Sequence, residues 1–403
     1  MKKVVIVGGG FAGIEVARVL QKHADRFTTT LVSKVHHFEY TPALYRVVTG
    51  ESPLEVCIPL TEIFSDDRVI VEVDEIVSVD QAQKKVIGAS GSHYEYDYLV
   101  LALGSETVFF NTAGMSEHSY GFKSINEALR LKRHLHKEFE EAKTCSDLDQ
   151  LPHMHIVIIG GGASGTELAG ELADYTRKFG IKHDVDINKI KITLIEGGPR
   201  LLAALPEKLA TQALDSLKKK GIEILLNTRV LKADEEKVYL QDHEIETNTI
   251  IWTAGVKPNK LYSNIGAPVA KNGRVEVDEI LRLKSAPEIF VVGDGAATTY
   301  SGMAQTAIYD GKFVGNNIAR LDYGDIPIKY NPSKPSYSVP AGPGWAVFSG
   351  FGLAFSGYLG FIMRKIIDLH YFFSILPLDK AITVWIDGKK LCETCPTCTK
   401  EKF

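Results

Sequence analysis

Short runs of apolar residues recur along the chain, and several of them end at a glycine. Residues 4–7 and 156–159 are unbroken runs of Val and Ile, the composition of strands that are buried on both faces of a parallel sheet. Further strands are predicted by the same pattern at residues 29–32, 96–104, 191–195, 249–255 and 288–295. Amphipathic spacing predicts helices at 125–143 and from 165 to about 178, and the alternation of strands with helices predicts an α/β fold.

The first two runs each lead into a glycine fingerprint with G-x-G-x-x-G spacing. Its members are Gly8, Gly10 and Gly13 after the first run, and Gly160, Gly162 and Gly165 after the second. The first glycine permits a tight turn, the second lets the backbone approach a pyrophosphate, and the third lets the helix pack on the strand. One such motif is weak evidence, but two in the same strand–turn–helix context predict two dinucleotides. We expect FAD at the first and a nicotinamide cofactor at the second.

Two acidic residues at strand ends extend this prediction. Glu196 follows the strand at 191–195, where a carboxylate accepts both ribose hydroxyls and repels a 2′-phosphate, so we expect NADH rather than NADPH. Asp294 follows Gly293 and suits a ribityl hydroxyl, and the helix from Ala304 onward should aim its N-terminus at the flavin. An ordinary surface Glu and a plain strand-end turn are the alternatives.

Composition restricts the classes that remain. A length of 403 residues predicts two to three domains, and a net charge of −4 is not typical of nucleic-acid binding. The chain enters a strand at Val4 without the pattern of an export signal. Of five cysteines, Cys392, Cys395 and Cys398 have the spacing of a partial metal site, with a redox-exposed tail as the alternative. Because a fourth ligand is not evident nearby, we expect no metal.

An uncharged stretch at residues 344–363 is long enough to cross a bilayer. Its glycines and serines, and the prolines before it, favour a strand at 345–348, a turn and a helix instead. Beyond Phe355, apolar residues recur at helical spacing at Tyr358, Leu359, Ile362, Ile366, Leu369, Phe373 and Leu376. Arg364, Lys365 and Asp368 fall opposite, so we expect an interfacial helix with its cations toward lipid phosphates. A bilayer span, docking on the protein core and a homodimer contact are the alternatives.

These motifs resemble the flavoproteins with two dinucleotide-binding domains of the glutathione reductase type. Within that superfamily, the segments at residues 42–50, 165–172 and 304–307 resemble type II NADH dehydrogenases, the single-chain, non-pumping NADH:quinone oxidoreductases. Two positions depart from the family. Ser33 and Lys34 stand where an acidic or amide residue often binds the FAD ribose, and Tyr309 stands where a second glutamine is common.

The resemblance implies two Rossmann-like domains, for FAD and NADH, and a C-terminal membrane-associating segment. The implied limits are 1–118 and 263–335 for the FAD domain, 119–262 for the NADH domain and 336–403 for the C-terminal region. The implied cofactor-binding residues are the six fingerprint glycines with Ser33, Lys34, Pro42, Ala102, Gly104, Glu196, Gly255, Asp294, Ala304 and Gln305. Glu167, Gln305 and Lys365 are the implied catalytic residues, and Gln305, Tyr309 and Lys365 the implied quinone contacts. A glutamate that only seats NADH or caps the helix is the alternative for Glu167.

The electron acceptor is the remaining question. A dithiol acceptor needs a cysteine pair, and neither Cys57 nor Cys145 has a partner close in sequence, which disfavours disulfide reductase and Cys-dependent sulfide oxidation. We therefore expect a peripheral enzyme on the cytoplasmic side of the cell membrane that reduces a quinone. A reductase acting on a ferredoxin-like protein or oxygen, and a flavoprotein that senses NADH without turnover, are the alternatives.

Overall fold

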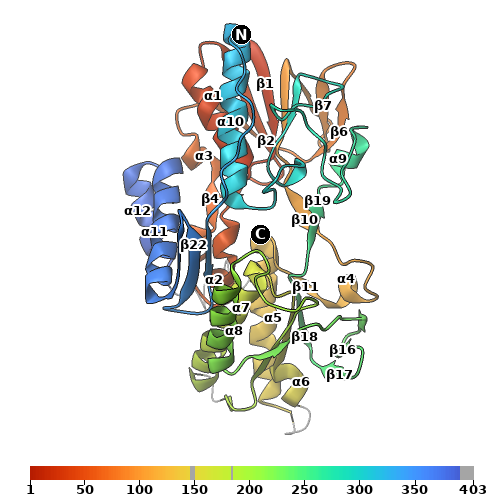
Figure 1. Ribbon diagram of the computed structural model, residues 1–403, viewed down its shortest axis with the longest axis vertical. Coiled ribbons are helices and arrows are strands. Elements are labelled where there is room, and N and C mark those ends of the chain that lie inside the picture. Colours follow the sequence, from red (N-terminus) through yellow and green to blue (C-terminus); the bar gives the residue numbers. More distant parts are fainter. Residues whose placement is uncertain (146–149, 183–184, 391–403) are drawn as a thin grey trace. The chain divides into compact units, whose positions relative to one another are not determined.

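The computed structural model describes residues 1–145, 150–182 and 185–390. The chain forms two compact units, each assembled from three separate segments. Unit 1 comprises Met1–Glu39, Ile58–Glu106 and Val256–Pro335, and unit 2 comprises Tyr40–Cys57, Thr107–Gly255 and Ser336–Phe403 (Figure 1). The domain limits given above assign a cofactor to each segment as well as its residues, and they stay a prediction.

Unit 1 is built on a five-stranded sheet in the order β20-β9-β1-β2-β5 with every neighbouring pair parallel. The strands are β1 (Lys2–Val7), β2 (Phe27–Ser33), β5 (Val69–Val73), β9 (Tyr98–Leu101) and β20 (Ile289–Val291). Helices α1 (Phe11–Leu20) and α10 (Ala304–Tyr323) pack against each other beside this sheet (Figure 1). The predicted strands at 4–7, 29–32, 96–104 and 288–295 are confirmed, although β9 and β20 are shorter than expected.

Smaller elements complete unit 1 and its boundaries. They are η1 (Gln21–His23), β3 (His37–Glu39), β4 (Cys57–Pro59), α3 (Leu60–Ile63), β6 (Ile76–Asp80), β7 (Lys85–Gly88), β8 (His93–Glu95), β10 (Ser105–Thr107), β19 (Val256–Pro258), α9 (Leu261–Asn264) and η4 (Gly293–Gly295). Strands β6, β7 and β8 form an antiparallel sheet. A buried cluster that includes Val86, Leu101, Tyr262 and Ile289 connects this small sheet to the parallel one.

Unit 2 repeats the parallel arrangement in the order β11-β18-β12-β13-β14. Its strands are β11 (Tyr120–Gly121), β12 (His155–Ile159), β13 (Lys191–Ile195), β14 (Glu223–Leu225) and β18 (Thr249–Trp252). Its helices before residue 336 are α2 (Leu44–Val48), α4 (Met115–His118), α5 (Ile125–Ala142), α6 (Gln150–Met154), α7 (Ala163–Lys182) and α8 (Glu207–Lys219), with 3₁₀ turns η2 (Thr41–Ala43) and η3 (Pro53–Glu55). Strands β15 (Lys232–Ala233), β16 (Lys237–Tyr239) and β17 (Glu244–Glu246) form an antiparallel sheet. Two Rossmann-like sheets confirm the predicted α/β class.

The C-terminal part of unit 2 is a three-stranded antiparallel sheet followed by two helices. The elements are β21 (Tyr337–Pro340), β22 (Ala346–Gly350), β23 (Leu353–Gly357), α11 (Tyr358–Ile375) and α12 (Leu378–Asp387). The expected strand and helix are present, but the turn between them contains a second strand, β23, that the sequence analysis missed. Helix α11 packs on β22 and α12 lies beside α11 (Figure 1). Within the described residues we find no helix that combines the length and apolar character required to cross a membrane.

The prediction that the charged side of α11 faces lipid phosphates is wrong. Arg364 is 5 % exposed and Asp368 is fully buried, and both are bonded to other parts of unit 2. The apolar side of α11 is the exposed one, with Leu359 at 67 % and Ile366 at 54 % exposure. Leu376, expected on that side, is buried. The helix turns its charges inward because polar partners in unit 2 satisfy them.

Candidate functional site

The first fingerprint is the turn between β1 and α1. Gly8 has φ +115°, a conformation that side chains rarely adopt, and a Cβ there would lie 2.3 Å from the carbonyl oxygen of Ala102. A Cβ at Gly13 would lie 1.9 Å from the carbonyl oxygen of Gly8. Both glycines are therefore required by contacts that the chain makes with itself.

The second fingerprint, between β12 and α7, has the same geometry. Gly160 has φ +113°, and a Cβ there would lie 2.7 Å from Cα of Ala254 at the end of β18. A Cβ at Gly165 would lie 1.9 Å from the carbonyl oxygen of Gly160, the same distance as in the first fingerprint. The two turns are thus built in the same way on two separate sheets.

No contact within the protein requires a glycine at the middle position of either fingerprint. A Cβ at Gly10 or at Gly162 would meet no atom within 4 Å. Gly10 is also the N-cap of α1, and no side chain caps that helix or places an acid in its first turn. Uncapped backbone N–H groups at the positive end of a helix favour an anion. Both turns therefore fit a pyrophosphate that approaches the backbone at the middle glycine.

Other predicted FAD-binding residues surround the turn in unit 1. Ser33 is buried at the end of β2, and its Oγ would lie 2.7 Å from a Cβ on Gly9. Lys34 instead points to solvent and pairs with Glu75 at 3.0 Å. Gly104 follows β9 with φ +66°, and its carbonyl accepts from the backbone N–H of Asn259 at 3.3 Å.

Asp294 lies in the 3₁₀ turn η4 that follows β20. Its Oδ2 accepts a 2.5 Å hydrogen bond from the hydroxyl of Ser105, so the carboxylate is held in place. The same turn is also held by Asp310 of α10, whose Oδ2 accepts a hydrogen bond from the backbone N–H of Gly293 at 3.0 Å. Burial raises the pKa of Asp310 to about 6, and Tyr330 donates to its Oδ1 at 2.6 Å. The sequence analysis missed Asp310, although an acid at the seventh position of a predicted helix was the available signal.

The acceptor-side residues on α10 also lie in unit 1. Ala304 and Gln305 form the first turn of the helix, and the side chain of Gln305 is exposed. The hydroxyl of Tyr309 donates to the backbone carbonyl of Asn331 at 3.0 Å, and its ring stacks on Phe313. The position where the family has a second glutamine thus carries a ring whose hydroxyl is bound within unit 1.

In unit 2, Glu196 stands at the end of β13 beside the second fingerprint. Its Oε2 accepts from the backbone N–H of Gly161 at 2.7 Å and its Oε1 from that of Gly198 at 2.6 Å. These bonds hold a carboxylate at the fingerprint turn, where the ribose of a nicotinamide cofactor was expected. Packing requires a glycine at position 255, since a Cβ there would lie 2.6 Å from the ring of Phe110.

A buried network of charged side chains, centred on Arg364 and Asp368 of α11, lies elsewhere in unit 2. Arg364 Nε donates to Asp368 Oδ1 at 2.9 Å, and Arg46 of α2 pairs with Asp368 Oδ2 at 2.5 Å. Glu55 pairs with Arg46 at 2.6 Å, and the hydroxyl of Tyr40 donates to Asp368 Oδ1 at 2.7 Å. We refer to Tyr40, Arg46, Glu55, Arg364 and Asp368 as the Arg364 network. Burial opposes ionisation of Asp368, but Arg364 and Arg46 outweigh it and hold its pKa below the ordinary value.

The Arg364 network reaches two residues that the sequence analysis selected. Arg364 donates to the carbonyl of Pro42, and its Nη1 lies 3.3 Å from Oε1 of Glu167 on α7. Pro42 therefore lies in unit 2, whereas the other residues predicted to bind FAD lie in unit 1.

Glu167 is a buried carboxyl with an unusually high pKa. Burial raises that pKa to about 7, against the opposing effect of Arg364 and Arg46. Asp368 and Glu55 already pair with the two guanidinium groups at shorter distances. Little positive charge is therefore left to stabilise the ionised form of Glu167. Near neutral pH this carboxyl is therefore able both to hold and to release a proton.

Burial also shifts the pKa values of two neighbouring groups of unit 2, in each case toward the neutral form. Burial raises the pKa of Glu171, one turn further along α7, to about 7. Burial and the charge of Arg46 lower the pKa of Lys365. The structure thus places Glu167 and Lys365 in unit 2, and Gln305 and Tyr309 in unit 1.

The cysteines follow the sequence analysis as far as they are described. Neither Cys57 nor Cys145 is in a disulfide, and no disulfide joins the described residues. Cys392, Cys395 and Cys398 lie outside the described residues.

Comparison with known proteins gives a family match over most of the chain. Residues 2–311 match the pyridine nucleotide-disulphide oxidoreductase family. Curated relatives include the type II NADH:quinone oxidoreductases of Staphylococcus haemolyticus and Staphylococcus aureus, each 29 % identical over 93 % of this chain and 96 % of theirs. These matches confirm the resemblance that the fingerprints and the segments at 42–50, 165–172 and 304–307 predict.

Solved structures with the same fold extend the comparison to the C-terminal region. The structure of NDH2 from Plasmodium falciparum in complex with NADH has a TM-score of 0.87 at 19 % identity and covers 97 % of this chain and 99 % of that chain. The sulfide:quinone oxidoreductase of Aquifex aeolicus has a TM-score of 0.78 at 22 % identity and covers 98 % of both chains. The fold is therefore shared over nearly the whole length.

The raised pKa of Glu167 predicts how stability depends on pH. The folded state binds the proton of this carboxyl more tightly than the unfolded state, whose pKa is near the ordinary 4.5. The carboxyl therefore destabilises the fold increasingly as the pH rises from about 5 to about 7. Relative to Glu167→Gln, the unfolding free energy of the wild type should fall across this window by on the order of 2–3 kcal/mol, measured by urea titration. The exposed Glu207→Gln variant is the control, and a difference between Glu167→Gln and wild type that does not change with pH would contradict the assignment.

Proposed function

The chain belongs to the pyridine nucleotide-disulphide oxidoreductase family, and we propose that it is an FAD-containing, non-pumping NADH:quinone oxidoreductase of type II. The observation that carries this proposal is the pair of fingerprints whose middle glycines, Gly10 and Gly162, face open space. Two pyrophosphate cradles in one chain fit one resident and one visiting dinucleotide. The curated relatives that bear this name, and the solved relative in complex with NADH, support the assignment.

Within this function each unit has its own binding task. The turn from Gly8 to Gly13 holds the FAD pyrophosphate, with Asp294 and Ser33 placed for the ribityl and ribose groups. The turn from Gly160 to Gly165 holds the pyrophosphate of NADH, with Glu196 on its ribose. When bound, FAD takes up two electrons from NADH and passes them to the quinone.

The acceptor side needs protons as well as electrons. Quinone reduction consumes two protons, and Glu167 is the buried carboxyl whose pKa of about 7 suits their delivery. Arg364 fixes the position of this carboxyl through the 3.3 Å contact and is a positioning residue in this scheme. We assign Gln305 as a hydrogen-bond donor to a quinone carbonyl, Tyr309 as a ring contact and Lys365 as a second polar group.

A quinone is a membrane substrate, so part of the surface should touch lipid. The exposed sides of the C-terminal hairpin and helices are apolar over Phe351, Leu353, Tyr358, Leu359, Ile362, Ile366, Phe373, Leu378, Ile382 and Ile386. Exposed apolar side chains gathered on neighbouring elements are typical of an interaction surface. We propose that it lies in the headgroup region on the cytoplasmic side of the membrane, with a homodimer contact as the alternative outcome of its test.

Turnover with quinone tests the function directly. Purified protein with bound FAD should oxidise NADH with menaquinone or ubiquinone analogues, and liposomes should increase the rate with long-tail quinones. Glu167→Gln should slow flavin reoxidation by quinone in stopped-flow, while flavin reduction by NADH stays within a few-fold of wild type. Fast turnover with oxygen or a ferredoxin-like protein and none with quinones would contradict the proposal.

Glu196 predicts the choice of nicotinamide cofactor. Replacing it with Gln removes the charge that repels a 2′-phosphate but leaves the pyrophosphate cradle intact, so kcat/KM for NADPH should rise relative to NADH by about tenfold or more. Glu207→Gln, on α8 of the same unit, should leave the ratio unchanged. A wild type that already uses both cofactors equally well would show that Glu196 does not select.

The apolar patch predicts membrane attachment. The double variant Leu359→Ser, Ile366→Ser should lose most of its co-sedimentation with vesicles of phosphatidylglycerol and phosphatidylethanolamine, because two exposed apolar side chains are removed from the contact. The matched control is Ile326→Ser, Ile328→Ser, which removes exposed isoleucines from unit 1. Loss of a dimer in both detergent and buffer, with vesicle binding unchanged, would assign the patch to self-association.

A further inference from the structure

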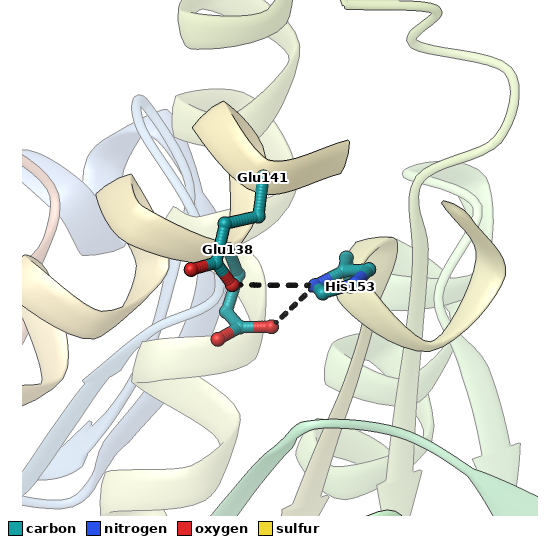
Figure 2. A group of neighbouring side chains, drawn as sticks. All are labelled: Glu138, Glu141 and His153. Atoms are coloured by element: carbon teal, nitrogen blue, oxygen red, sulfur yellow. Dashed lines mark hydrogen bonds and ion pairs between the residues drawn. The ribbon is translucent and has the colours of Figure 1, made fainter. Parts of the chain in front are cut away.

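A second group of ligand-type side chains lies in unit 2, where the end of α5 meets α6. Glu138 and Glu141, one turn apart on α5, point toward His153 of α6 (Figure 2). One ligand atom from each of the three residues falls within 4.8 Å of the others. Asn248, directly before β18, completes the group, and its backbone N–H donates to the carbonyl of Pro152 at 3.0 Å. The group is thus held by two helices and the start of a strand.

Glu138 is a buried carboxylate whose partners carry no permanent positive charge. It is only 4 % exposed, and its ion-pair partners among the described residues are His153 at 2.8 Å and His134 at 3.5 Å. A buried carboxylate without a lasting countercharge is costly, so a cation is the expected complement.

Three polar atoms are crowded together beside Glu138. Its Oε2 lies 2.8 Å from Nδ1 of His153 and 2.9 Å from Nδ2 of Asn248, and these two nitrogens are 3.1 Å apart. If the imidazole nitrogen accepts from the amide, it faces the carboxylate as a second acceptor. If it donates to the carboxylate, it faces the amide as a second donor. Either protonation therefore leaves one like pair in close contact.

A metal ion resolves this conflict because each of the three groups then offers a lone pair. The amide of Asn248, turned over, presents its Oδ1 in place of Nδ2. Neighbouring ligands of an octahedral ion with bonds of about 2.0–2.1 Å lie about 2.9 Å apart. The three separations of 2.8, 2.9 and 3.1 Å match that spacing. Glu141 Oε2, 3.9 Å from Nδ1 of His153, is within reach as a fourth ligand.

We propose that Glu138, Glu141, His153 and Asn248 form a binding site for a divalent first-row metal ion with mixed nitrogen and oxygen ligands. His134 supports the site from behind, since its Nδ1 faces Oε1 of Glu138 while its Nε2 lies 3.0 Å from the carbonyl of Asn248. The site is at the amino ends of β12 and β18, and the second fingerprint is at their carboxyl ends. Its role is structural, joining α5 and α6 to the start of β18.

Binding of Mn²⁺ to the full chain tests the proposal. Mn²⁺ suits carboxylate and amide ligands better than thiolates, and it is followed by the loss of the free-ion EPR signal. The wild-type site and its variants are all compared in a background with Cys392→Ser, Cys395→Ser and Cys398→Ser, so that the cysteine-rich tail cannot contribute. The wild-type site should bind one Mn²⁺ per chain and raise the thermal unfolding midpoint.

Matched variants separate the site from non-specific binding. Glu141→Gln should weaken Mn²⁺ binding about tenfold or more, whereas Glu140→Gln, at the neighbouring exposed position of α5, should leave it unchanged. His153→Gln should abolish binding and His155→Gln should retain it. Absence of saturable binding to wild type, or equal loss in the members of either pair, would overturn the proposal. These measurements do not depend on NADH oxidation, so they stand apart from the proposed function.

Discussion

Both units depend on a contact between strand-end turn and helix that is too close for any side chain. At Gly13 and at Gly165 a Cβ would lie 1.9 Å from the carbonyl oxygen of the first glycine of the same motif. Each helix is therefore drawn against the end of its strand, and its N-terminus is fixed beside the open backbone of the middle glycine. The spacing that allows the helix to pack also leaves room for a ligand phosphate. Packing and binding are two results of one constraint.

The strands and the two cradles could be predicted because their signals are local. Runs such as residues 4–7 and 156–159 identify buried strands by composition, and glycine spacing identifies the turns that follow. Strand β23 was missed because its segment, rich in Gly and Ser, has no alternation of apolar and polar residues. Periodicity on α11 correctly located a two-sided helix, but periodicity alone does not say which side faces the protein.

The inverted orientation of α11 could not be predicted because its cause is remote in sequence. Arg364 and Asp368 face inward since Pro42, Tyr40 and Arg46, more than 300 residues earlier, supply their partners. In this network the two arginines pair with Asp368 and Glu55, and Glu167 is left with the longest contact to a guanidinium. A buried charge network of this kind adds little net stability but fixes geometry closely. The protonation of one carboxyl is thus set by how its neighbours pair with each other.

The segmental composition of the units has a consequence for how the protein is made. The polypeptide crosses from one unit to the other five times, and the last strand of the first sheet, β20, is not synthesised until residue 291. Until then β9 presents an unpaired edge, and the helix that covers α1 has yet to emerge. The second unit waits longer still, because Asp368, which pairs with Arg46, is made only near the end of the chain. Neither unit therefore holds all of its contacts until late in synthesis, and the open strand edge of the first sheet is exposed to mispairing until β20 is made.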